Sequence, residues 1–146
     1  MSNKLEKIKQ EAAKGNLDAI YQLGFAYYTG KSIEPDMNKA IECFKKAASS
    51  GHVQSIQALG VCYANGDGVT KDLEKAVFWY RKGSDLGYDQ SKYNLALCYY
   101  RGEGVTQDEE IGKALMEEAA KTDVDAKRFI RKVYKKSFFD RFRGKQ

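Results

Sequence analysis

The stretch Leu59–Ala76, LGVCYANGDGVTKDLEKA, decides the fold of this chain, because its most distinctive residues recur along the sequence. Equivalent residues lie 36 positions apart in three successive units. Recurrence at one fixed period indicates a repeat architecture, which shared composition alone does not produce. The matching sets are Leu23-Gly24, Leu59-Gly60 and Leu95-Ala96; Tyr27, Tyr63 and Tyr99; Gly30, Gly66 and Gly102; Ile33, Val69 and Val105; and Asp36, Asp72 and Asp108.

Each unit has the pattern of two helices. Apolar or aromatic side chains recur every three or four residues in both halves, as at Ala19, Leu23 and Tyr27 and again at Ala40, Phe44 and Ala47. A single helix–turn–helix cannot bury both of its apolar faces, whereas stacked units share one continuous core. We therefore predict an all-α protein, an α-solenoid of tandem helix–turn–helix repeats with a right-handed superhelix.

The repeat spacing also predicts the organisation of the chain as one domain of 146 residues. We expect a half-repeat helix at 2–15, repeats at 16–51, 52–87 and 88–122, and a capping helix with a basic tail at 123–146.

The glycine-rich loop within each unit is predicted to turn the chain between its two helices. Gly66 falls where the first helix must stop and suits a left-handed cap, and Gly68 permits the following bend. Val69 can fill the gap between units, and Asp72 stands where the second helix needs an N-cap. A phosphate-binding loop is disfavoured, because neither G-x-x-x-x-G-K-[ST] nor G-x-G-x-x-G is complete and no strand precedes the loop.

The pattern L-G-x-x-Y-x-x-G-x-G-V-x-x-D-x-x-K-A, read from Leu59 to Ala76, resembles the Sel-1-like repeat, a longer cousin of the tetratricopeptide repeat. The first unit departs from it at Ser32, and the third at Ala96 and Gly112. The resemblance implies a solenoid that binds other proteins. The roles that the resemblance implies are those of an adaptor in signalling or membrane-protein degradation or, in bacteria, of a virulence or toxin-neutralising (immunity) partner. The family has no common catalytic apparatus, and function does not follow from fold.

Alignment on the tetratricopeptide pattern predicts which side chains line the concave face and contact a partner polypeptide there. Tyrosine and arginine are prominent among them, and both are frequent in interface hot spots. Packing of some of these rings between repeats is the alternative. The predicted residues are Tyr21, Phe25, Tyr28, Gln57, Val61, Asn65, Tyr93, Leu97, Tyr100, Arg101, Phe129 and Lys132.

The sequence offers little for catalysis or for binding a metal. The chain has one histidine, His52, so neither a zinc site nor a Ser-His-Asp set can be proposed from the sequence, although folding can unite distant residues. Cys62 and Cys98 are one repeat apart, beyond disulfide reach, whereas antiparallel helices could bring Cys43 level with Cys62. Buried thiols are the favoured interpretation. We predict no enzyme and no cofactor, with a small hydrolase as a disfavoured alternative.

The basic charge belongs to the carboxyl end of the chain. Residues 1–120 carry a formal charge of −2, and residues 121–146 carry +7. We expect either a capping helix with solvated charges or, as an alternative, a tail that contacts another protein or an anionic membrane surface. Nucleic acid is the least favoured partner. The residues of the predicted tail contact are Phe138, Phe139, Phe142, Arg141 and Arg143.

The amino-terminal residues lack the apolar segment of a secretory signal, which predicts a cytoplasmic protein. Taken together, the sequence predicts a non-enzymatic interaction module that holds a partner polypeptide in its concave groove.

Overall fold

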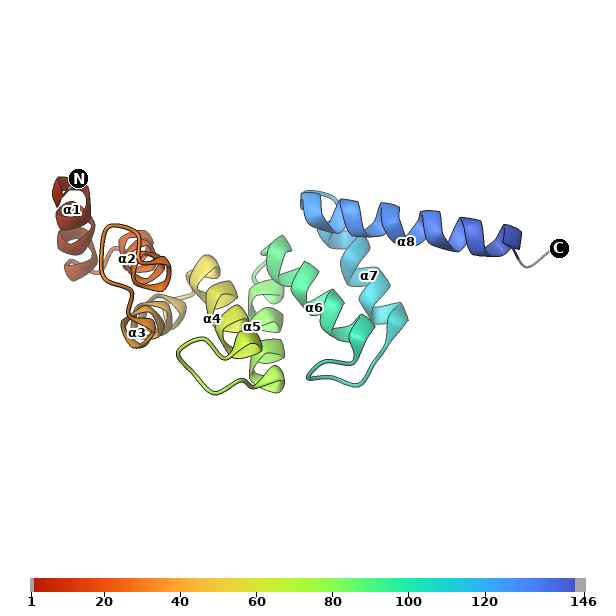
Figure 1. Cartoon of the computed structure of the whole chain (residues 1–146), viewed down its shortest axis with the longest axis horizontal. Helices are drawn as coiled ribbons and strands as arrows, with labels where there is room; N and C mark the ends of the chain where they lie inside the picture. Colours follow the sequence, from red (N-terminus) through yellow and green to blue (C-terminus); the bar gives the residue numbers. More distant parts are fainter. Residues whose placement is uncertain (1, 144–146) are drawn as a thin grey trace.

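The computed structural model describes residues 2–143, and the side chains of Ser2, Tyr134 and residues 137–143 lie outside that description. The described residues form eight helices and no strand (Figure 1). The helices are α1 (Ser2–Ala13), α2 (Leu17–Thr29), α3 (Met37–Ala48), α4 (Val53–Asn65), α5 (Leu73–Asp85), α6 (Asp89–Arg101), α7 (Glu109–Ala119) and α8 (Val124–Arg143).

The helices follow one another in a row, with the first helix and the last at opposite ends of the row (Figure 1). Extensive packing among the described helices joins elements adjacent in sequence: α1 with α2, α2 with α3, and so on to α7 with α8. The buried side chains accordingly form separate clusters along the row. This arrangement confirms the predicted α-solenoid, in which each unit is stabilised by its neighbours.

The predicted turn chemistry is confirmed at each loop between paired helices. Gly66 ends α4 in the left-handed conformation with φ +76°, and its N–H donates to the Cys62 carbonyl at 2.8 Å. Asp72 caps α5 by accepting the Lys75 N–H at 3.0 Å. Ser32, which replaces a turn glycine in the first repeat, is itself forced to φ +65°.

Small residues on the first helix of each pair receive a large side chain from the second. A Cβ built on Gly60 would lie 2.4 Å from Tyr80 Cε1, so the ring packs directly on the α4 backbone. In the third repeat Ala96 and Met116 occupy the positions equivalent to Gly60 and Tyr80 and share one buried cluster. The flexible methionine side chain accommodates the extra methyl group that a tyrosine ring could not.

The last helix, α8, packs against α7 through its first turns and then continues beyond it (Figure 1). Phe129 and Ile130 contact the cluster that contains Met116 and Ala119. The five residues of the predicted tail contact, Phe138, Phe139, Arg141, Phe142 and Arg143, lie outside the described side chains. No helix within residues 2–143 combines the length and the apolar character needed to span a bilayer.

Candidate functional site

Five of the twelve predicted partner-contact residues come together around one hollow of about 210 Å³, which we call the inter-repeat hollow. Its walls come from α2 and α4, with contributions from α3 and the start of α6. Its lining contains aromatic, aliphatic and amide side chains, and no charged residue is among those described there. The predicted residues are Tyr21, Phe25, Tyr28, Gln57 and Val61, and the others are Phe44, Gln54, Ala58, Cys62, Tyr88 and Gln90.

Two aromatic residues of α2 form one wall of the hollow. Tyr21 is half-buried, with its ring centroid 5.9 Å from that of Phe44 and 5.4 Å from that of His52. Burial raises the pKa of the Tyr21 hydroxyl, and nearby Tyr88 adds to this effect. Phe25 lies beside Tyr21 at 6.1 Å, and 47% of its surface is exposed. The Tyr21 ring is thus held in place by the core, and the neighbouring Phe25 ring is available for contact with a partner.

Tyr28 ties the end of α2 to the turn of the second repeat. Its hydroxyl donates to Asp67 Oδ2 at 2.8 Å, a contact between residues 39 positions apart. This hydrogen bond is the main reason why the pKa of Tyr28 is raised to about 12, and burial of the hydroxyl is the second reason. Asn65, a further predicted partner contact, also donates to Asp67 Oδ2, at 3.4 Å. The Tyr28 ring is therefore fixed in the wall, and the hydroxyl already has a partner.

The polar groups of the hollow are amides and hydroxyls. Gln57 is only 6% exposed, and its Oε1 accepts the Ser91 hydroxyl at 2.8 Å, so this side chain mainly joins α4 to α6. Gln90 Oε1 accepts the Tyr88 hydroxyl at 3.1 Å. Gln54 is exposed at the rim. Amides both donate and accept hydrogen bonds, which suits them to the unpaired backbone groups of a bound peptide.

A second hollow, of about 380 Å³, lies between α1 and α2, and we call it the N-terminal hollow. It shares Tyr21 and Phe25 with the inter-repeat hollow. Sequence reasoning did not include Leu5 and Ile8 in the site, although their i, i+3 spacing in α1 was a usable signal of an apolar face. The remaining lining residues are Lys4, Gln22, Ala26, Thr29, Lys31 and Ser32.

Three of the four predicted contact residues of the third repeat, Tyr93, Leu97 and Tyr100, pack in the cluster that the last helix also contacts, and none of them lines either hollow. The Tyr100 ring lies 5.4 Å from that of Phe129, so α8 covers part of this wall. Tyr93 and Leu97 pack on the same buried cluster. Among the remaining predicted contacts, Arg101 and Lys132 are exposed.

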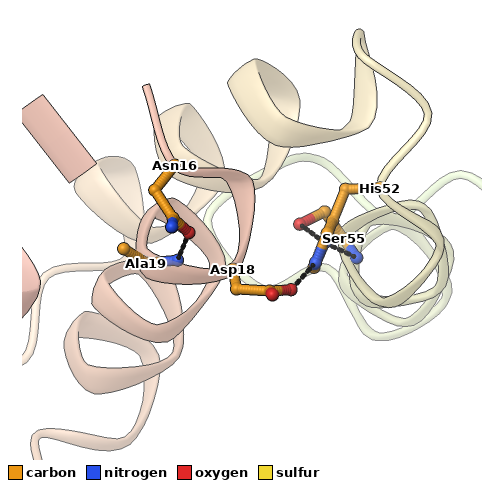
Figure 2. Close-up of polar contacts among 5 residues, drawn as sticks. All are labelled: Asn16, Asp18, Ala19, His52 and Ser55. Carbon is orange, nitrogen blue, oxygen red and sulfur yellow. Dashed lines mark hydrogen bonds and ion pairs between the residues drawn. The ribbon is translucent and has the colours of Figure 1, made fainter. Parts of the chain in front are cut away.

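The structure also places a serine, a histidine and an aspartate in one hydrogen-bonded chain, which sequence reasoning had not found (Figure 2). Asp18 Oδ1 lies 2.8 Å from His52 Nε2, and the Ser55 hydroxyl lies 2.9 Å from His52 Nδ1. The Ser55 N–H also donates to Nδ1, at 3.3 Å, which makes His52 the N-cap of α4. These partners assign the ring proton to Nε2, from which it is donated to Asp18.

This chain resembles a catalytic triad in connectivity but not in accessibility. In a hydrolase the serine is open to substrate and the aspartate is buried. Here Ser55 has no exposed surface, whereas 76% of the Asp18 side chain is exposed. His52 occupies in α4 the position that Asn16 occupies in α2, where Asn16 accepts the Ala19 N–H at 3.0 Å (Figure 2). The arrangement therefore caps a helix and links the first two repeats.

All three cysteines are free thiols in the structure, so Cys43 and Cys62, whose pairing the sequence had left open, are not joined in it. Burial raises the pKa of the Cys62 and Cys98 thiols to about 11, and it raises that of Cys43 as well. Such thiols are weak nucleophiles near neutral pH. Within the described residues no three histidine, cysteine or acidic side chains gather as metal ligands.

Comparison with known proteins identifies the repeat. The family profile of the Sel1 repeat matches residues 17–52, 53–88 and 89–121, well over half of the chain. No curated protein sequence matches.

Solved structures with the same architecture include a protective antigen from uropathogenic Escherichia coli that displays an SLR fold, with 34% identity and a TM-score of 0.80 over 84% of this chain. The alignment spans only 26% of that antigen. A Sel1 repeat protein from Oxalobacter formigenes is 30% identical, with a TM-score of 0.77 over 88% of this chain and 98% of its own. Helicobacter pylori cysteine-rich protein B follows at 25% identity and a TM-score of 0.68, over 86% of this chain and 96% of its own. This chain is therefore a member of the Sel1 repeat family, whose proteins are protein-interaction modules.

Proposed function

We propose that this protein is a non-enzymatic interaction module that binds a segment of a partner polypeptide in the inter-repeat hollow. The observation that carries the proposal is the composition of that hollow, whose aromatic wall and amide groups stand side by side without a charge among the described lining residues. Burying one leucine-sized side chain there would contribute about 1.5–3 kcal/mol, and the amides could satisfy the backbone that accompanies it.

Phe25 gives the sharpest test of this proposal. Its ring is 47% exposed, so its removal should leave the fold intact while removing contact area. Tyr28 and Tyr100 are less suitable because each is less exposed than Phe25 and contacts another part of the fold, through Asp67 and Phe129 respectively. Phe78 on α5 is the matched control, since it is 58% exposed and lines neither hollow.

The experiment selects peptides from a displayed library of random 12-residue sequences on the full chain, followed by calorimetric titration of the enriched peptides. Phe25→Ala should weaken their binding about tenfold or more, and Phe78→Ala should leave the dissociation constant unchanged. Circular dichroism of both variants checks that the helices persist. The proposal fails if no peptide is enriched, or if Phe25→Ala binds as tightly as the unmodified chain.

The family resemblance directs this proposal towards an adaptor or a toxin-neutralising partner. The burial of Ser55 supports the absence of hydrolase chemistry. Turnover of a panel of esters and β-lactams that is abolished by His52→Ala would contradict that part of the proposal.

A second candidate function, tethering to an anionic membrane surface, is favoured by one feature of α8. Six exposed basic residues recur at i, i+1, i+4, i+5, i+8 and i+9, which places them on one half of the helix, opposite Phe129 and Ile130. Flotation with vesicles rich in phosphatidylserine should recover the full chain but not a triple charge reversal, and vesicles of phosphatidylcholine should recover neither. Equal recovery of the full chain on both kinds of vesicle would exclude tethering through these charges. The basic residues are Lys127, Arg128, Arg131, Lys132, Lys135 and Lys136, and the reversal is Lys132→Glu, Lys135→Glu and Lys136→Glu.

A further inference from the structure

The two hollows are neighbours that share a wall. Tyr21 and Phe25 line both the inter-repeat hollow and the N-terminal hollow. Phe25, with nearly half of its surface exposed, therefore stands between two apolar depressions. A ligand that fills both depressions must pass over this ring and place one side chain on each side of it.

The two hollows differ in their charge. The described lining of the inter-repeat hollow is uncharged. The N-terminal hollow has an apolar lining from Leu5, Ile8 and Ala26, together with two lysines, Lys4 and Lys31. Both lysines are exposed, and neither forms an ion pair with a carboxylate among the described residues. An apolar side chain with a carboxylate next to it would complement this end of the site.

The polar groups favour an extended occupant over a helical one. Gln54 is exposed at the rim of the inter-repeat hollow, and an amide there can bind free backbone N–H and C=O groups. An extended peptide offers these groups, whereas a helix has already paired them internally. In an extended peptide, side chains at i and i+2 point to the same side, about 7 Å apart. This short step suits two depressions that share a wall.

From these observations, and resting on the proposed function, we propose that the partner segment is an extended acidic peptide with two apolar anchors at i and i+2. One anchor enters the inter-repeat hollow, and the other enters the N-terminal hollow. A carboxylate adjacent to the second anchor lies between Lys4 and Lys31.

The test repeats the random 12-residue peptide selection on the full chain and on the double variant Lys4→Glu, Lys31→Glu. Peptides enriched on the unmodified chain should share an apolar-x-apolar pattern flanked by Asp or Glu. The double variant should instead enrich Lys or Arg at that flank. A matched control, Lys45→Glu with Lys46→Glu, makes the same charge change on α3, where the two exposed lysines line neither hollow. It should return the same peptides as the unmodified chain.

Titration of one enriched peptide makes the expectation quantitative. Replacing its carboxylate by an amide should weaken binding to the unmodified chain about threefold to tenfold at 50 mM salt, and less at 500 mM. The double variant should bind the original peptide at least tenfold more weakly. Replacing either apolar anchor by serine should weaken binding about tenfold to a hundredfold.

The outcomes separate this inference from the proposed function. If enriched peptides lose affinity on Phe25→Ala but show no acidic flank, or no response to Lys4→Glu with Lys31→Glu, then the acidic partner is refuted and the binding hollow stands. If they bind equally well to Phe25→Ala, or if none is enriched, both proposals fail.

Discussion

The contact between Gly60 and Tyr80 allows a quantitative test of how the repeats are packed. A Cβ at Gly60 would lie 2.4 Å from Tyr80 Cε1 and 2.5 Å from Cδ1, well inside van der Waals contact. The Tyr80 ring is 5% exposed, so it cannot swing away into solvent. Overpacking of this kind costs up to about 3 kcal/mol, whereas alanine gains about 1 kcal/mol over glycine in helix propensity. Gly60→Ala should therefore lower the free energy of unfolding by about 2 kcal/mol.

The third repeat suggests a second substitution that should recover part of the stability lost in Gly60→Ala. Ala96 and Met116 stand where the second repeat has Gly60 and Tyr80, and both are fully buried. Tyr80→Met alone should be destabilising because it leaves the space of the ring partly empty. The double variant Gly60→Ala, Tyr80→Met should lose about 1 kcal/mol less than the sum of the two single changes, because the new methyl group then occupies part of that space.

Urea unfolding followed by circular dichroism at 222 nm measures all three variants. Ala96→Gly is the reverse change in the third repeat; it should cost about 2 kcal/mol, because it lowers helix propensity and also removes a buried methyl group, without any clash. The reasoning is refuted if Gly60→Ala is as stable as the unmodified chain, or if the two single losses simply add in the double variant.

Three further predictions concern stability and thiol chemistry. Ser32→Gly should raise the melting temperature by about 2–4 °C because it relieves a left-handed serine, and a fall would show that its side chain makes a stabilising contact instead. His52→Ala should lose about 1 kcal/mol of unfolding free energy and His52→Asn less, since asparagine also caps helices; equal losses in urea titrations would assign the effect to packing. At pH 8 iodoacetamide should label half-buried Cys43 before Cys62 and Cys98, whose raised pKa of about 11 keeps them protonated. Their labelling should accelerate as the pH rises towards 11, and equal rates at pH 8, measured by peptide mapping, would contradict this order.

Local chemistry was sufficient to predict the helix pairs and their loops. Gly66 stops α4 because only glycine adopts the left-handed cap at low cost, and Asp72 starts α5 because its carboxylate accepts a free backbone N–H. These interactions involve residues close together in the chain. The 36-residue spacing then repeats the same unit three times, and the exposed apolar faces of each unit require stacking.

Contacts between neighbouring repeats depended on the tertiary structure. Asp18 meets His52 across 34 residues and Tyr28 meets Asp67 across 39, although neither pair stands in a recognisable motif. The stacking of the helices also leaves Phe25 exposed between the two hollows. Such contacts depend on the angle and offset with which one helix pair stacks on the next. Because many side chains along the shared interface contribute to that angle together, no short stretch of residues determines it.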